Sequence, residues 1–355
     1  MSRNFILYLI CIGCLPSCVY AQLAKFRKIV PFDSNYIRTY PKVFALYLPL
    51  TAPYLKFVFR DFKTGNKLNF QPTKQFDLGI GLNYRGLNLI VGTGISLFKE
   101  NEIKQGKTKY TDIQVHYMPR RFANDIYYQK YKGFYIKNSR DFGAYQSSTD
   151  YQIRPDLSSN LVVFNSNYIF NYKQFSFKNA FGFNETQLKS AGSPLVGAYY
   201  SLFNISTDSA IVSNPFTQYF SSDGTIKKST EQTLGINIGY IYTRVILNNF
   251  HATVMLLQGG GIYKMNYTLT DNSDHSGKIN IGGKTNLRLS FRYDSGKIFV
   301  GAMSIYDNYY FNGSSSSLFN FGNGKVRIFA GYRFGKGELN IIKDKITNEI
   351  SPIQN

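Results

Sequence analysis

Residues 76–84, FDLGIGLNY, carry a large apolar side chain at every second position, with small or polar residues between. A two-residue period is the period of a β-strand, so this stretch has one apolar face and one small or polar face. In a soluble protein the apolar face meets the core, whereas in an outer-membrane barrel it meets lipid and the other face lines the lumen. The chain therefore needs a fold that gives each face its own solvent.

The same alternation recurs along the chain, in the stretches 87–97, 175–183, 234–242, 287–293 and 326–334. Strands of about ten residues with aromatic ends are typical of transmembrane β-strands. Beyond the first twenty residues there is no apolar run of 18, which excludes a helical membrane protein. We therefore expect an all-β fold, a transmembrane antiparallel up-and-down β-barrel.

Connection lengths predict the strand number. Tight turns are expected at 84–87, 172–175, 247–250 and 294–297, and long polar loops at 99–109, 137–156, 184–193, 269–277 and 312–322. If 194–230 is one loop, the barrel has about twelve strands, which is the number we favour. If 194–205 and 210–220 instead form a hairpin, it has fourteen. Both numbers are even and place both termini in the periplasm. The twelve lie near 54–62, 76–85, 87–98, 110–118, 125–136, 157–172, 174–185, 231–245, 250–268, 278–293, 297–311 and 323–334.

The first residues predict export. A basic residue precedes the apolar run FILYLICIGCLPSC (5–18), and VYA follows, which fits a signal peptide, residues 1–21, cut between Ala21 and Gln22. A rival interpretation is a lipobox with Cys18 lipidated. The expected segments are then a periplasmic N-terminal segment at 22–53, the barrel at 54–334 and a periplasmic tail at 335–355. Together with the strand pattern, this leader predicts the outer membrane as the location.

Charge and cysteine content restrict the partners. The 41 basic residues exceed the 21 acidic ones, giving a net charge of +20. Export argues against nucleic acid, so we expect the basic surplus on loops and in the lumen. All three cysteines lie in the leader, which leaves no disulfide framework. Expected partners are outer-membrane lipids, lipopolysaccharide, the barrel-assembly machinery and small anionic solutes. Four mid-strand residues predict one positive wall of the lumen: Arg288, Arg292, Arg327 and Arg333.

Several segments resemble a known family. RPDL (154–157), YIFNYKQFSFKNAF (168–181) and QLKSAGS (187–193) are similar to a family of exported Bacteroidota proteins, the domain of unknown function 4421. DIYYQKYKGFY (125–135) and SNYIRTY (34–40) extend the resemblance over most of the chain. The resemblance implies an outer-membrane β-barrel of the Bacteroidota envelope and implies no activity.

The QLKSAGS segment is the most specific candidate site. Its small residues, Ser190, Gly192 and Ser193 among them, allow a loop to fold closely against the barrel wall. Gln187 and Lys189 are then available to bind lumen groups or an anionic ligand, and Arg154 and Asp156 are candidate partners for them. The alternative is a structural one, a loop lock that closes the mouth of the barrel.

Catalytic, metal and cofactor motifs are not found. The three histidines, His116, His251 and His275, show no metal-ligand spacing, and His116 falls on the polar face of a strand. DHSG (274–277) sets acid, histidine and serine side by side, a spacing that seldom gives catalytic geometry. GKINIGGKT (277–285) fails the spacing of a phosphate-binding loop. We expect no catalytic residue, no metal and no cofactor.

Three functions are compatible with this sequence. The first is a non-enzymatic barrel, either a porin-like route for small solutes through a basic lumen or a scaffold for an envelope complex. The second is an outer-membrane enzyme that modifies lipids, which a hydroxyl–histidine–acid constellation in the fold favours. The third is a soluble periplasmic binding sandwich, which a continuous apolar belt excludes.

Overall fold

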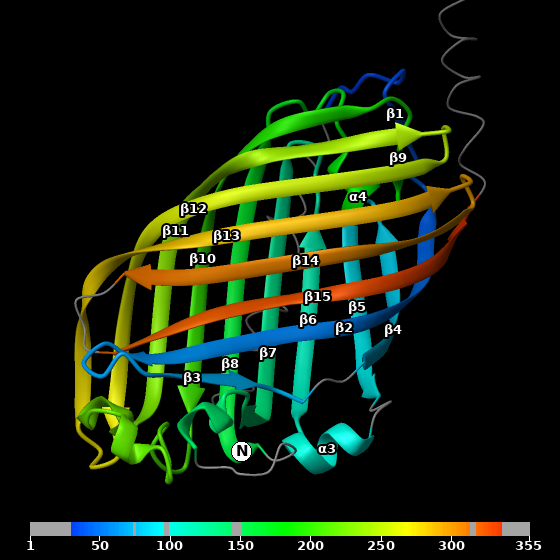
Figure 1. Ribbon diagram of the computed structural model, residues 1–355. Helices are drawn as coiled ribbons and strands as arrows, with labels where there is room; N and C mark the ends of the chain where they lie inside the picture. The colour runs from blue at the N-terminus through cyan, green and yellow to red at the C-terminus, as the bar shows by residue number, and fades with distance from the viewer. Residues whose placement is uncertain (1–29, 74–75, 96–98, 144–150, 313–316, 336–355) are drawn as a thin grey trace, which may run out of the picture. The chain divides into compact units, whose positions relative to one another are not determined.

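The computed structural model describes residues 30–73, 76–95, 99–143, 151–312 and 317–335 (Figure 1). The chain divides into two compact units, Met1–Phe32 and Asp33–Asn355, and all the elements below belong to the second. The expected signal peptide with Ala21 and Gln22, and nearly all of the expected tail, lie outside the described residues. Among the described residues, no helix has the length and apolar character needed to cross a membrane.

Twelve strands form one closed antiparallel ring, which confirms the expected fold class and strand number. The chain-terminal members of the ring, β2 and β15, pair with each other from Phe44↔Phe334 to Asp61↔Ser317 and so close the barrel. The ring strands are β2 (Phe44–Asp61), β4 (Phe76–Tyr84), β5 (Leu87–Ile95), β6 (Lys109–Tyr117), β7 (Phe122–Ile136), β8 (Gln152–Ile169), β10 (Ala191–Ser206), β11 (Ile226–Ile246), β12 (Phe250–Leu269), β13 (Asp274–Asp294), β14 (Ile298–Asn312) and β15 (Ser317–Phe334).

The remaining elements lie between the ring strands. β1 (Ile37–Thr39) and β9 (Glu185–Gln187) form a two-stranded sheet of their own, and β3 (Lys67–Gln71) bridges β2 and β7. The helical elements are α3 (Lys99–Gln105), α4 (Phe177–Phe181) and three short 3₁₀ turns, η1 (Ser139–Phe142), η2 (Thr217–Tyr219) and η3 (Ser222–Thr225).

The two ends of the barrel differ in their connections. Short turns at 85–86, 118–121, 247–249 and 295–297 lie at one end, which we call the turn end and which also holds the start of β2 and the end of β15. Most of the longer connections lie at the other, the loop end, whereas the connection 170–190 between β8 and β10 lies at the turn end. Two-residue turns such as 85–86 require left-handed backbone, and Arg85 and Gly86 both have positive φ.

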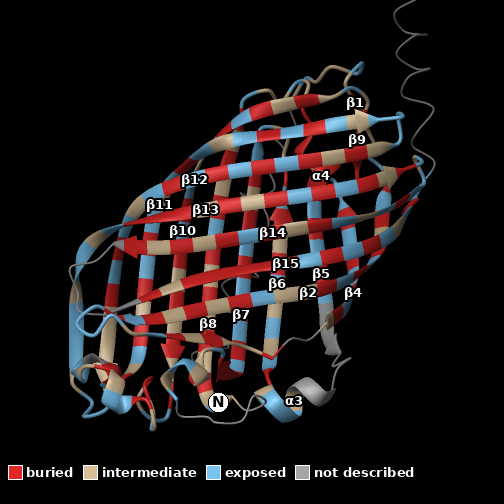
Figure 2. Cartoon of the chain, viewed as in Figure 1, coloured by how far each residue is buried: buried red, intermediate tan, exposed pale blue. Residues whose placement is uncertain are grey.

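The two faces of the wall meet the two environments that the alternation predicts. Figure 2 shows buried and exposed residues alternating along the ring strands. Within FDLGIGLNY, Ile80 is 56% exposed on the outer face, whereas Asn83 is fully buried on the inner one. Every ring strand carries at least one exposed large apolar side chain, and together these make an apolar belt. Aromatic residues such as Tyr84, Tyr332 and Phe334 lie toward its turn end. This belt excludes the soluble sandwich.

One expected strand is wrong. The stretch 174–185 does not cross the barrel; with its neighbours it forms a segment, 170–190, that carries α4 and β9 inside the lumen. FSFKNAFGF alternates like a strand, but Ser176 accepts the backbone N–H of Asn179 at 3.1 Å and so caps a helix turn. The place in the ring is taken by β10, which lies largely in the stretch treated as a loop. The strand number stays at twelve because one crossing replaces the other.

The first ring strand also begins earlier than 54. β2 starts at Phe44, so residues 44–53 belong to the wall and not to an N-terminal segment. Two prolines, Pro49 and Pro53, interrupt the strand pattern in this stretch, because proline cannot donate to the ladder. Both prolines lie where β2 lacks a ladder partner on one side: the β4 register skips residues 48 and 49 and ends at Thr51, and β3 pairs only from Phe57.

The interior contains two apolar clusters. At the loop end, aromatic rings from opposite walls meet, among them Phe57 of β2 and Phe203 of β10, whose centroids are 6.0 Å apart. At the turn end, Phe177, Phe181 and Phe183 of the inserted segment pack against the wall. A layer of charged and amide side chains lies between the two clusters.

Candidate functional site

The inserted segment 170–190 is held at the turn end by a cluster that we call the turn-end lock. Its centre is Asp294, at the end of β13. The Asp294 carboxylate pairs with Arg333 Nη1 at 2.6 Å and with Arg292 Nη2 at 2.9 Å. Arg292 also donates to the Asn179 side chain at 2.7 Å, and Arg333 donates to the Phe183 carbonyl. The two arginines therefore tie the segment to two wall strands.

Glu185 of β9 is the second charged group of the lock. Arg120 contributes a two-pronged pair at 2.6 and 2.9 Å, Lys178 lies at 3.2 Å, and the Ser176 hydroxyl donates at 2.5 Å. Burial alone raises the pKa of the Glu185 carboxyl, but Lys178, Arg120 and Ser176 together hold that pKa below its ordinary value. Glu185 is therefore a buried carboxylate with its charge fully compensated.

Gln187 joins the segment to itself and to the N-terminal strand β1. Its side-chain oxygen accepts the Ser176 backbone N–H at 2.9 Å, and its amide nitrogen donates to the carbonyls of Gln174 and Lys189 at 2.7 and 2.9 Å. Its own carbonyl lies 3.0 Å from His251 Nε2 on β12. Gln187 therefore has a positioning role, with its hydrogen-bonding groups occupied by protein.

The small residues after Gln187 fasten the segment to the wall. Ser190 Oγ accepts the Val245 backbone N–H, and Ser193 Oγ accepts that of Asn171, both at 2.9 Å. A side chain on Gly192 would lie 2.7 Å from the Ile241 carbonyl, so only glycine fits there. Lys189 is exposed, with its ammonium 5.5 Å from the centre of the Tyr36 ring.

Arg154 and Asp156 are not partners of Gln187 and Lys189, and that expectation is corrected. Both lie at the loop-end part of β8, whereas Gln187 lies at the turn end. Arg154 binds Asp156 in a two-pronged pair at 2.9 Å and donates to the Ile211 carbonyl at 2.8 Å. The pair therefore fastens the 207–225 connection at the opposite end of the barrel.

The central layer bridges opposite walls. Arg288 of β13 pairs with Asp125 of β7 at 2.5 Å, and Asp125 also bonds His116 Nδ1 at 2.6 Å. Lys284 of β13 pairs with Asp307 at 3.1 Å and donates to Asn165 of β8 at 2.7 Å. His116 is therefore one member of a buried network. In an open lumen Arg288 and Lys284 would be hydrated, whereas here carboxylate and amide side chains surround them.

The four arginines expected in the lumen all point inward, and each is at most 3% exposed. Three of them have carboxylate partners, and Arg327 instead donates to the Thr51 hydroxyl at 3.0 Å. The expected wall of unopposed positive charge does not form among the described residues, because Asp125 of β7 pairs with Arg288, and Asp294 of β13 pairs with both Arg292 and Arg333. In the part of the chain that the structure describes, buried basic and acidic residues are equal in number, seven of each: Arg154, Lys284, Arg288, Arg292, Lys325, Arg327 and Arg333 against Asp61, Asp77, Asp125, Glu185, Glu231, Asp294 and Asp307.

A hydroxyl and a histidine do approach each other near DHSG. Ser273 Oγ lies 3.2 Å from His275 Nε2 in an exposed hairpin between β12 and β13. The same hydroxyl donates to Asp271 at 2.6 Å, so its proton points away from the histidine. A nucleophile needs its proton directed to the base. Among the described residues, no group of three or more His, Cys, Asp or Glu side chains could hold a metal ion.

Some residues of the lock carry no recognisable signal in the sequence. Arg120 and Glu185, which form one ion pair, are 65 positions apart, and Asp294 and Arg333, which form another, are 39 positions apart. Asp125 lies inside a segment that resembles the family, and its alternation places it on the inner face, which is the one signal that could have suggested a partner for Arg288.

The fold and the filled interior define a closed, plugged β-barrel of the transmembrane type. The chain belongs to the family described as Domain of unknown function (DUF4421), whose family model matches residues 31–334. None of the curated proteins compared with the chain matches it.

Solved structures of outer-membrane barrels are similar in outline. The outer membrane protease OmpT from Escherichia coli shares 7% identity at a TM-score of 0.38, over 83% of this chain and 98% of that one. The translocator domain of the autotransporter NalP from Neisseria meningitidis shares 9% at 0.31, over 82% and 88%. The Pseudomonas putida toluene transporter TodX shares 6% at 0.26, over 82% and 89%.

Proposed function

We propose that the protein is a non-enzymatic outer-membrane barrel whose interior is closed, and that it acts as a membrane-embedded scaffold and not as a pore. One observation carries this proposal: side chains from opposite walls meet inside the ring. The Phe57–Phe203 contact does so at the loop end and the Arg288–Asp125 pair in the centre. At the turn end the inserted segment fills the remaining cross-section.

The location rests on two further features. The apolar belt with aromatic residues at its turn end suits a bilayer. The leader of residues 1–21 suits export, and an even strand number suits periplasmic termini. A periplasmic turn end leaves the loop end, with Arg154 and Asp156, on the cell surface.

Single-channel recording in planar bilayers tests the closed interior. We expect no discrete conductance steps from protein whose insertion is verified by a heat-modifiable band on gels and by protection from protease. A variant that lacks residues 173–188 and carries Phe57→Ala, Phe203→Ala, Arg288→Ala and Asp125→Ala loses the contacts at all three levels and serves as the open control. Conductance steps in the parent protein contradict the proposal, and an anion-selective reversal potential in that case favours a route for anionic solutes.

A further inference from the structure

The hydrogen-bonded wall of the barrel is interrupted beside β2. Residues 52–56 of β2 pair with β15 on one side. On the other side, β4 pairs with β2 only up to Thr51↔Asp77, and β3 begins at Phe57↔Phe70. β5 and β6 also separate beyond Ile90↔Gln114. The described strands therefore leave an opening in the wall, bordered by β2, the end of β3, the start of β4 and the loop-end part of β6 and β7.

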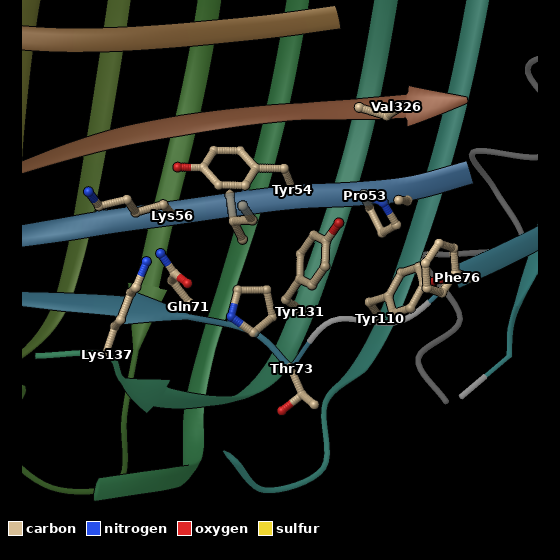
Figure 3. A pocket seen from close by; sticks show the side chains of 13 residues that line it. Pro53, Tyr54, Lys56, Gln71, Thr73, Phe76, Tyr110, Tyr131, Lys137 and Val326 are labelled. Atoms are coloured by element: carbon tan, nitrogen blue, oxygen red, sulfur yellow. The ribbon is translucent and has the colours of Figure 1, made fainter. Parts of the chain in front are cut away.

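A pocket of ≈ 610 Å³ occupies this opening (Figure 3). This volume lies within the roughly 300–1,000 Å³ of ligand sites in proteins. Most of its lining is apolar or aromatic: Pro53, Tyr54, Pro72, Phe76, Tyr110 and Tyr131. An opening in a barrel wall exposes backbone groups that the hydrocarbon of the bilayer cannot hydrogen-bond, so an occupant that has polar atoms as well as an apolar part is favoured.

Two buried hydroxyls in the pocket lack a partner. The rings of Tyr110 and Tyr131 stack with centroids 5.4 Å apart, and Tyr131 is only 2% exposed. Neither phenolic oxygen has a hydrogen-bond partner among the described residues. Figure 3 shows the ring of Tyr131 in the middle of the opening. Because buried polar groups are normally satisfied, these hydroxyls call for an occupant that carries acceptor oxygens.

The pocket also has a positive margin. Lys56 and Lys137 line it, and Lys67 is near enough to repel Lys56. Within the described ranges none of the three makes an ion pair. On the outer face of β2, Leu48, Leu50 and Tyr54 belong to the apolar belt, and Lys56 is the next outward position beyond Tyr54. The pocket therefore lies where the belt gives way to the loop end, at the level of lipid headgroups.

We propose that this pocket binds an anionic lipid from the surrounding bilayer. An acyl chain enters from the belt between Pro53, Pro72 and Phe76 and reaches the two tyrosines. The ester oxygens of the lipid accept the tyrosine hydroxyls, and its phosphate lies beside Lys56 and Lys137. This inference needs the barrel to be in a membrane, but it does not depend on a closed interior.

The absence of tryptophan from the chain makes a direct test possible. A single tryptophan at Tyr131→Trp reports on the pocket. A single tryptophan at Tyr127→Trp is the matched control, because Tyr127 is on the same strand, is also 2% exposed and does not line the pocket. In liposomes of phosphatidylglycerol with brominated acyl chains, we expect loss of fluorescence for Y131W and none for Y127W. Equal quenching of both, or of neither, overturns the proposal.

The headgroup is tested with charge variants. In phosphatidylcholine liposomes that contain a minority of one brominated lipid, brominated phosphatidylglycerol should quench Y131W more than brominated phosphatidylcholine does. Adding Lys56→Gln and Lys137→Gln should remove this preference. Adding Lys264→Gln and Lys278→Gln, at exposed lysines on β12 and β13, should preserve it. Equal quenching by the two lipids in Y131W overturns the anionic specificity.

Native mass spectrometry of the unmutated protein supplies a measurement that no pocket variant can disturb. The parent, stripped of bulk lipid in detergent, should retain phosphatidylglycerol in preference to phosphatidylcholine when both are supplied. The Lys56→Gln/Lys137→Gln protein should lose that retained lipid. A parent that retains neither lipid, or both equally, contradicts the proposal.

Discussion

The two ends of the barrel fill the same cross-section in different ways. At the loop end large side chains of the wall meet, as Phe203 stacks on Phe321 at 4.4 Å and contacts Phe57 at 6.0 Å. Apolar side chains of the 207–225 connection complete that cluster. At the turn end the wall instead encloses a separate segment, 170–190, and binds it through ion pairs and amide hydrogen bonds. A ring of twelve strands is too wide for ordinary side chains to fill alone, so something has to be added.

The inward residues explain which end needs the inserted segment. At the loop end they are large and aromatic. At the turn end many are small, which leaves room for α4 and β9: Ala45, Asn83, Ala123, Ser193, Thr243, Thr253 and Ser290. Small inward-facing side chains on the wall strands therefore mark the part of the lumen that an inserted segment can occupy. The two apolar clusters share no residue, so each end can be perturbed separately.

The largest effect is expected at Asp294, which pairs with two buried arginines. Asp294→Asn leaves Arg292 and Arg333 without a carboxylate, and breaking a buried pair costs about 3–5 kcal/mol. The free energy of unfolding can be measured by urea titration in liposomes, followed by the heat-modifiable band. Asp208→Asn, at an exposed loop-end position, is the control and should be neutral. An unchanged unfolding free energy for Asp294→Asn contradicts the described lock.

The loop-end counterpart is Phe203→Ala. Truncating a buried phenylalanine costs about 3–5 kcal/mol. Unlike Asp294→Asn, it should leave the inserted segment bound, because Phe203 is not in the turn-end cluster. Limited proteolysis of residues 170–190 separates the two variants: cleavage should increase in Asp294→Asn and not in Phe203→Ala. Equal cleavage in both means that the two ends do not behave independently.

A smaller effect is expected from overfilling the turn end. Ala123 is fully buried in the same cluster as Phe177 and Phe181. Ala123→Leu should cost about 1–3 kcal/mol, because extra methylene groups force neighbours out of position. Val196→Leu, on the outer face of β10, adds one methylene where lipid yields and should be close to neutral. A tolerated Ala123→Leu means that the segment packs loosely.

The smallest effect is the pH dependence of the lock. The pKa of Glu185 is lower in the folded protein than in the unfolded chain. Its contribution to stability is therefore present above the unfolded pKa of about 4.3 and is lost as pH falls through the lower folded value. Protease protection of residues 170–190 should hold from pH 7 to 5 and decline in more acidic buffer. In Glu185→Gln, residues 170–190 should be less protected from protease at pH 7, and the further loss of protection in acid that comes from protonation of Glu185 should be absent.

The sequence predicts the wall well because the wall obeys a local rule. Ile80 and Asn83 of β4, or Ile236 and Asn237 of β11, fall on the faces that a two-residue period assigns to them. FSFKNAFGF follows the same rule and still forms a helix turn inside the lumen. Alternation reports two different faces, but it does not report whether a segment is part of the ring.

The turn-end lock is harder to predict from the sequence, for a different reason. Gln187 and Ser193 stand out in the sequence because of their local segment, but the Gln187 side chain binds backbone groups of Ser176 and Gln174 within the same inserted segment. Glu185 meets Arg120, and Asp294 meets Arg333, only after the strands have been arranged in a ring. Such pairings depend on the register of distant strands, which no short pattern encodes.

The closure of the ring by β2 and β15 has a consequence for the order of assembly. These two strands are the first and the last of the wall, and 170–190 lies near the middle of the chain between them. β1, which precedes the wall, pairs with β9 of that segment. β1 and the inserted segment are therefore both synthesised before β15, while the wall is still without its last strand and has two unpaired edges. A chain that stops before β15 has two unpaired strand edges, because β2 and β14 lack their partner. The ring of this barrel therefore closes only when its last strand has been made.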